Sequence, residues 1–202
     1  MPVCQDFFCQ SSFYQQLFEL DQAIAAAVRQ AGCPYCSGRL HVADYPRKPR
    51  GLREPLTADY QRRLSFCCAH DDCRRRTTPP SVRFLGRKVY LGVIVILVSA
   101  LQHGLTDRRR RQLIEQLDLW PQTIARWRRW WREGFAASRC WQALRARFIP
   151  PIADNVLPGA ALGRLSGADL AERVRHWLGW LAPVTTTAWA GSLLDVRRPQ
   201  KM

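Results

Sequence analysis

The chain has 202 residues, 47% of them hydrophobic, so it can bury a core as one domain or two small ones and is not expected to be disordered. Its formal net charge is +15, and residues 74–132 hold 14 basic side chains against three acidic ones. A positive field concentrated in one segment attracts polyanions, which points to nucleic acid as a partner.

The first residues contain no basic segment followed by an apolar run, so no secretory signal is expected. We therefore expect a cytoplasmic, nucleoid-associated protein whose eight cysteines stay reduced. Such cysteines are metal ligands or free thiols rather than a disulfide framework. Cys4, Cys9 and Cys140 have no convincing metal partners and are expected to be free or buried thiols.

Residues 1–31 are predicted to supply an N-terminal helix over residues 11–31. Ser12, followed three residues later by Gln15, resembles a capping box, and Gly32 is suited to end the helix. Apolar residues recur at three- and four-residue steps and predict one buried stripe, made of Phe13, Leu17, Leu20, Ile24 and Val28. The stripe is expected to pack on the rest of the fold, and the alternative is self-association, which would give a homodimer.

Residues 32–81 are predicted to form a small β zinc ribbon. Cys33 and Cys36 are separated by Pro-Tyr, a spacing whose tight turn aims two thiolates at one ion. A second pair, Cys68 and Cys73, provides two more ligands and completes a closed structural Zn²⁺ site. Strands are predicted on the ribbon over 39–45 and 62–68.

Two alternatives remain open at this site. Cys67 could replace its neighbour Cys68, although Cys68 makes the shorter turn with Cys73. His70 is a reserve ligand. A redox-active pair is disfavoured because a second thiol pair follows and no thioredoxin-like pattern is present.

The run Arg74, Arg75 and Arg76 directly follows Cys73, the last cysteine of the predicted ribbon. An extended segment this basic can lie along phosphates, which makes it a candidate DNA backbone contact. The simpler interpretation is a solvated loop.

Residues 82–135 are predicted to be a three-helix, helix-turn-helix unit. The apolar run 90–101 is too short to cross a bilayer, which takes about 20 residues, and predicts a buried first helix, with a strand pair as the competitor. Thr106 would cap the second helix, whose first turns carry Arg108 and Arg109 as possible phosphate contacts. Asp118-Leu119-Trp120 would make the turn, and Pro121 suits the first position of the third helix.

The third helix is predicted over about residues 121–133. At 100° per residue, Ile124, Trp127 and Trp131 fall on one face, toward the core. The opposite face carries Gln122, Arg126, Arg129 and Glu133. Since the N-terminal residues of a recognition helix meet base edges, Gln122, Thr123 and Arg126 are the expected base readers. Arg128 and Arg132 flank this face and are expected to contact phosphates, and the alternative is an ordinary amphipathic surface helix.

Three of these motifs together resemble a known class of proteins. The cysteine pair at 33–36, the stretch 66–90 and the Thr123–Trp131 segment look like bacterial mobile-element proteins, similar to the N-terminal zinc-ribbon and helix-turn-helix region of transposases. The resemblance covers roughly residues 33–135 and implies recognition of element ends or a nearby operator. The catalytic RNase H-like domain of such transposases is not expected in residues 136–202, because this segment is short and its acids are only Asp154, Asp169, Glu172 and Asp195.

Residues 136–202 are predicted to form a C-terminal helical segment. Short helices are expected over 136–150 and 169–181, with a linker over 152–166 and a frayed tail from 191. The three tryptophans of the tail, Trp177, Trp180 and Trp189, are expected to complete the core, and a partner surface is the alternative.

The sequence thus predicts a mainly α protein with a small β zinc ribbon, a helix-turn-helix unit and C-terminal helices. We expect a non-enzymatic, sequence-specific binder of double-stranded DNA that assists or regulates a mobile element. A separate transposase or recombinase subunit is a candidate partner, and no membrane partner is expected. One alternative is a non-specific RNA or single-strand binder. The other is a catalytic transposase or nuclease fragment, for which Asp154 and Asp169 would be the candidate acids.

Overall fold

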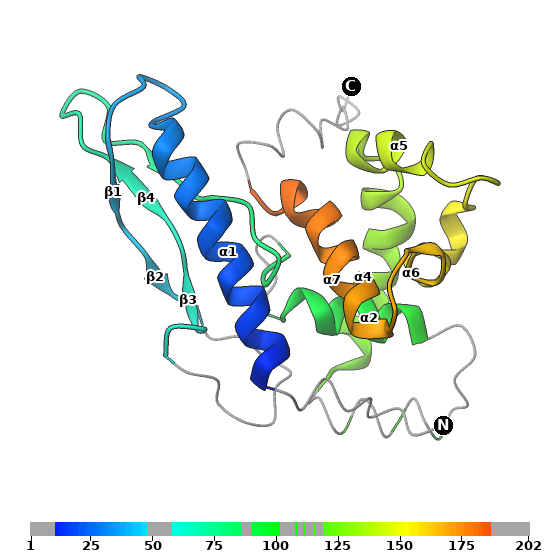
Figure 1. Cartoon of the computed structure of the whole chain (residues 1–202). Helices are drawn as coiled ribbons and strands as arrows, with labels where there is room; N and C mark the ends of the chain where they lie inside the picture. The colour runs from blue at the N-terminus through cyan, green and yellow to red at the C-terminus, as the bar shows by residue number, and fades with distance from the viewer. Residues whose placement is uncertain are drawn as a thin grey trace, which may run out of the picture.

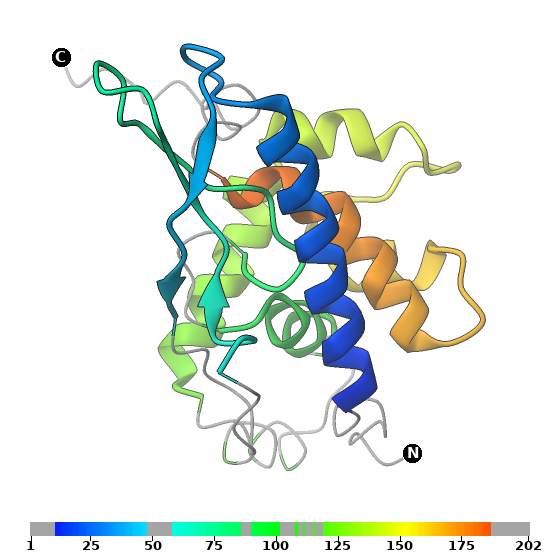
Figure 2. The same ribbon diagram turned by 60° about the vertical axis from the view of Figure 1, so that its left-hand side comes forward.

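The computed structural model describes residues 11–47, 58–85, 90–101, 108, 111, 115 and 119–186. The fold is mainly helical, with small antiparallel sheets beside a cluster of four cysteines. Helix α1 (Ser11–Ala31) lies between a ribbon of short strands and a body of helices (Figures 1 and 2). The predicted tail from 191 and the tryptophan at 189 lie outside the described residues, as do Cys4 and Cys9.

Helix α1 has the predicted bounds, and Gly32 follows it with φ of 80°. This left-handed conformation suits glycine and lets the chain leave the helix sharply. The predicted apolar stripe is partly wrong. Leu20 is 43% exposed, whereas Asp21 is buried and the core contacts include Tyr14 and Ala25.

Short strands build the ribbon. Strand β4 (Phe66–Cys68) lies between β1 (Leu40–Val42) and β5 (Arg76–Thr77), and β2 (Tyr45–Pro46) pairs with β3 (Arg62–Arg63). All pairs are antiparallel, with Leu40 opposite Cys68 and Cys67 opposite Arg76. A small core joins the ribbon to the end of α1 and contains Ala25, Cys33, Leu40, Phe66 and Cys68.

The apolar run predicted as a buried helix forms α2 (Gly92–Leu101). Its side chains from Val93 to Val98 are all buried, and an isolated bridge between Phe84 and Leu91 precedes it. A Cβ on Gly92 would lie 2.8 Å from Leu178 Cδ2, so the helix start packs closely on α7 (Leu170–Leu181). In the described part of the chain, no helix combines the length and apolar character needed to cross a membrane.

Helix α4 (Pro121–Arg129) continues into the π-helix η2 (Trp130–Phe135), where Ala136 N–H donates to the Trp131 carbonyl at 3.2 Å. The body is completed by α5 (Arg139–Arg145), the 3-10 helix η3 (Asp154–Val156), α6 (Gly159–Arg164), α7 and the 3-10 helix η4 (Ala182–Thr185). The predicted linker over 152–166 is therefore wrong. It contains η3 and α6, and it contributes the buried residues Ile152, Leu157, Ala161, Leu162 and Leu165 to the core.

Aromatic rings fill the centre of the helical body. Trp131 and Trp177 stack with their ring centroids 6.3 Å apart, and Phe135 and Trp141 pack edge-on or tilted against them. Trp131, Trp141 and Trp177 are fully buried. The expectation that the Trp177 region completes the core is confirmed, since this cluster joins α7 to η2 and α5.

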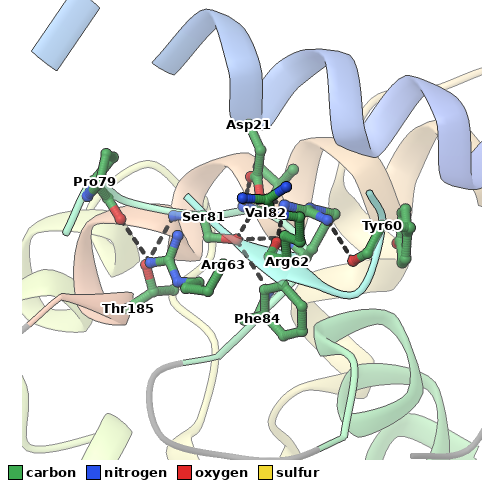
Figure 3. Close-up of polar contacts among 10 residues, drawn as sticks. Asp21, Tyr60, Arg62, Arg63, Pro79, Ser81, Val82, Phe84 and Thr185 are labelled. Carbon is green, nitrogen blue, oxygen red and sulfur yellow. Dashed lines mark hydrogen bonds and ion pairs between the residues drawn. The ribbon is translucent and has the colours of Figure 1, made fainter. Parts of the chain in front are cut away.

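A buried polar network joins the ribbon, α1 and the helical body (Figure 3). Arg83 Nε donates to Asp21 Oδ2 at 2.7 Å, and both side chains are almost completely buried. The same guanidinium donates to the carbonyls of Tyr60 at 2.6 Å and Arg62 at 2.9 Å, beside β3. Asp21 also accepts hydrogen bonds from Ser81 Oγ and Val82 N–H.

The network reaches the C-terminal helices through Thr185, whose Oγ1 accepts from Ser81 N–H at 2.9 Å. Burying a charge pair costs desolvation free energy, and this cost is offset only when the remaining donors and acceptors of the pair have partners. Here both carboxylate oxygens and all three guanidinium nitrogens of Arg83 have partners. The network therefore fixes the base of the ribbon relative to the helices.

Candidate metal centre and nucleic-acid interface

Four cysteines from two distant turns converge at the end of the ribbon. The sulfurs of Cys33, Cys36, Cys68 and Cys73 all lie within 4.8 Å of one another. Cys33 Sγ is 3.8 Å from Cys73 Sγ, and Cys36 Sγ is 3.4 Å from Cys68 Sγ. The group could hold one metal ion, and four thiolates at this spacing are the ligand set of structural zinc.

The two turns have matching local geometry. Each ligand sulfur accepts a hydrogen bond from the backbone N–H two residues further along the chain, on Tyr35, Gly38, His70 and Arg75. The residue after the second cysteine of each pair has a positive φ, 58° at Ser37 and 44° at Arg74. Such turns aim sulfurs and N–H groups at one point, and the N–H groups stabilise negative charge on the sulfurs.

Gly38 permits the close approach of the two turns. A Cβ at this position would lie 3.1 Å from Cys68 Sγ and 3.2 Å from Cys36 Sγ. Any larger residue would therefore push against two ligand sulfurs. This role was not predicted, although a glycine two residues after a Cys-x-x-Cys pair is a visible signal for it.

The neighbouring thiols change one another's ionisation in both directions. Burial raises the pKa of Cys33, but hydrogen bonds from the backbone of Tyr35 and Cys36 and from neighbouring thiols lower it to about 7. At Cys36, Cys68 and Cys73 the backbone N–H groups favour the thiolate, yet burial and the adjacent sulfurs leave the pKa raised. Four thiolates this close would repel one another, so all four sulfurs can be ionised together only when a cation lies between them.

Cys68, which was preferred to Cys67, belongs to the cluster that could hold the ion. The thiol of Cys67 points elsewhere, 3.4 Å from the Arg74 carbonyl. Neighbouring residues of a strand face opposite sides, so only one of the two can reach the metal position. His70 is outside the cluster and contributes its backbone N–H, which donates to Cys68 Sγ at 3.4 Å.

Helix α4 has the predicted separation of faces. Ile124 and Trp127 are buried, and Trp131 follows them into the core from η2. Gln122, Arg126, Arg128, Arg129, Arg132 and Glu133 are exposed. This surface, which we call the α4 basic face, carries four arginines and one acid.

Thr123 is a correction to the expected base readers. Its side chain is 6% exposed, and its Oγ1 accepts a hydrogen bond from Arg126 Nη2 at 3.0 Å. The helical period places residue 123 about one turn before the buried Trp127, so both lie on the core side of the helix. The hydroxyl therefore positions Arg126 and is not available to a base.

The helix-turn-helix itself stays a prediction. Helices α2 and α4 are in contact, but between Leu101 and Leu119 the structure describes only Arg108, Arg111 and Glu115, which are helical and exposed. Arg109 lies outside the described residues, as do Thr106 and Asp118.

The three arginines after Cys73 are exposed, and each has a partner. Arg74 forms an ion pair with Asp71 at 2.6 Å. The Arg75 guanidinium lies over the ring of Tyr35, 4.4 Å from its centroid, and so joins the two cysteine turns. Arg76 donates to the Ala43 carbonyl at 3.1 Å. The Tyr35–Arg75 pair was not anticipated, because the two residues are distant in sequence.

The two acids considered for catalysis have structural partners. Asp154 Oδ1 accepts from Trp141 Nε1 at 2.7 Å, and Asp169 caps α7 by accepting from Glu172 N–H at 2.8 Å. Among the described residues, the cysteine cluster is the group of metal-binding side chains that the fold brings together.

Comparisons of the chain with protein-family models, with curated proteins and with solved structures each found no match.

Proposed function

We propose that the protein binds double-stranded DNA with sequence preference, as an accessory or regulator of a mobile element. The observation that carries this proposal is the α4 basic face, which is exposed along a helix whose opposite side is locked into the aromatic core. A helix about 10–12 Å wide fits the major groove of B-DNA. Four arginines on such a helix match the charge of the phosphates on either side.

Each exposed side chain then has a role that its chemistry suits. Arg126 pairs with the O6 and N7 atoms of guanine, and Gln122 pairs with the N6 and N7 atoms of adenine. Arg128, Arg129 and Arg132 contact phosphates and hold the helix in register. Thr123 acts through Arg126, which it orients.

The zinc ribbon supports binding as a second, sequence-independent contact. Its metal is structural, because four protein thiolates leave no open coordination position. The two cysteine turns form the tip of the ribbon. Arg75 lies there, stacked on Tyr35, where a phosphate could approach from solvent. Zinc fixes this tip and thereby fixes the position of the cations.

The proposal includes no catalytic step. Asp154 and Asp169 each stabilise the helical body, and neither joins another carboxylate in a metal-binding group of the described residues. Strand transfer, where it occurs, would be done by a separate transposase or recombinase subunit.

Selection of bound duplexes from a random pool tests this function. Wild-type protein should enrich a common sequence motif, since each good bidentate contact discriminates by about 1–3 kcal/mol. Arg126→Ala should bind with a relaxed motif at one position. Arg139→Ala is the control, because it removes an exposed arginine from α5 and should leave the motif intact. Enrichment of no motif by the wild type, or identical motifs for wild type and Arg126→Ala, would contradict the proposal.

A second candidate is non-specific binding of RNA or single strands, and the Tyr35–Arg75 stack favours it. Tyr35 is 52% exposed beside a guanidinium, an arrangement on which a nucleobase can stack. Competition between duplex and single-stranded probes separates the two functions. Preference for the single strand that disappears in Tyr35→Ala would favour this second candidate.

A further inference from the structure

Trp120 is more exposed than the other tryptophans of the described residues. Seven of the eight tryptophans lie in the described residues, and six of these are buried or half-buried. Trp120 is 65% exposed. An isolated exposed apolar side chain needs no explanation by itself, so its support and its surroundings decide whether it has a role.

The backbone beneath this indole is held on both sides. Leu119 is buried before it, and Thr123 and Ile124 are buried after it. The Trp120 carbonyl accepts hydrogen bonds from Thr123 N–H at 2.8 Å and Ile124 N–H at 3.3 Å, and Pro121 restricts the next φ. The side chain therefore extends from a fixed point at the start of α4.

The charge around this position matches a polyanion. The first turn of α4 contains no acidic residue, and the exposed positions that follow include Gln122 and Arg126. The N-terminal end of a recognition helix is the end that meets base edges. An indole has one donor and no acceptor, so it cannot read a base pattern in the way that arginine does. Its flat apolar surface can stack on an exposed base or separate two bases.

We propose that Trp120 stacks on a base at an unpaired or unstacked step beside the site bound by α4, so that the protein prefers DNA distorted at that step to an intact duplex. This inference rests on the proposed function, since it assigns a DNA structure to the same surface. The partner is DNA because the helix that begins at the indole exposes Arg126, Arg128 and Arg129 and contains no acidic residue in its first turn.

The test measures affinity for two fluorescent DNA probes of one sequence, an intact duplex and the same duplex with a single unpaired adenine. Wild-type protein should bind the second probe more tightly, by on the order of tenfold, the effect of stacking one base. Trp120→Ala should lose this preference and keep the affinity for the intact duplex. Trp120→Phe should keep part of the preference, because a smaller ring still stacks.

Ile149→Ala is the matched control, since Ile149 is 93% exposed and lies outside α4. It should behave as the wild type does. Near-ultraviolet circular dichroism of the buried tryptophans verifies that each variant is folded.

Equal binding of both probes by the wild type would overturn the inference and leave the proposed function standing. Binding of neither probe would overturn both. If Trp120→Ala weakens self-association in sedimentation and changes neither DNA affinity, the indole belongs to a protein interface and the inference is wrong.

Discussion

At the scale of single residues, Gly38 is the position outside the four cysteines that lies directly against the clustered sulfurs. Its missing side chain lets two ligand sulfurs come within 3.1 and 3.2 Å of the Cβ position. We predict that Gly38→Ala lowers zinc affinity at least tenfold, the order of loss expected when the surroundings of metal ligands are disturbed. Competition with a chromogenic chelator measures this change.

Gly163→Ala is the matched control for that experiment. Nothing lies within 4 Å of a Cβ at Gly163, which is in α6. Alanine favours a helix more than glycine does, so this variant should keep its zinc and gain a little stability. Equal zinc affinity in Gly38→Ala and the wild type would show that the turns tolerate the added methyl group.

Asp21 makes a separate prediction about stability. Asp21→Asn removes the charge that balances Arg83 and presents an amide donor to other donors. Leaving a buried charge without its partner costs about 3–5 kcal/mol. Urea denaturation should therefore show a large fall in the free energy of unfolding.

Asp71→Asn is the corresponding control in an exposed ion pair. The side chains of Arg74 and Asp71 are 64% and 86% exposed, so solvent screens their attraction. Its loss should barely change the stability. Similar small effects for both variants would mean that the Asp21–Arg83 pair does not hold the ribbon to the helices.

At the scale of elements, the tip of the ribbon and α4 should affect DNA binding differently. In the proposed complex Arg75 contacts phosphate independently of sequence, so Arg75→Ala should weaken binding to all duplexes alike. The dependence of log Kobs on log salt should become shallower by about one unit. Affinities for a preferred and a scrambled duplex, measured across salt concentrations, check this. A change in the preference itself would assign base contact to Arg75.

Elements governed by local patterns could be predicted from the sequence. Helix α1 has the predicted bounds, because the apolar period and Gly32 are local signals. The convergence of the four cysteines, which could hold one metal ion, follows from cysteine spacing and strand alternation. The buried side of α4 also follows from one helical period, which places Ile124 and Trp127 inward.

Features that depend on tertiary contacts could not be predicted in the same way. Asp21 was overlooked because its partner Arg83 is 62 residues away, and an acid within an apolar helix face looks like a solvent position. Asp21 is buried beside Arg83, while the neighbouring Leu20 is 43% exposed. The segment 152–166 resembles a linker because of its Gly and Pro residues. In the fold, however, Asp154 accepts a hydrogen bond from Trp141, and Ile152 and Leu157 of this segment are buried in the core.

At the scale of the whole molecule, two hydrophobic cores differ in what stabilises them. The small core of the ribbon contains two of the four clustered cysteines, Cys33 and Cys68, whereas the large core contains the buried tryptophans. Zinc removal by a chelator should therefore loosen the ribbon and preserve the helical body. Amide hydrogen exchange should accelerate in β1 and β4, while the near-ultraviolet signal of the tryptophans persists. Loss of that signal on chelation would show that the two cores unfold together.

The central claim is that a zinc-fixed ribbon and the α4 basic face together bind a duplex. The most direct measurement is the affinity of zinc-loaded protein for a fluorescent duplex across a range of salt concentrations. We predict tight binding at low salt and a steep linear fall of log Kobs with log salt, because several arginines displace counterions. Absence of binding at low salt, or an affinity that does not change with salt, would contradict the claim.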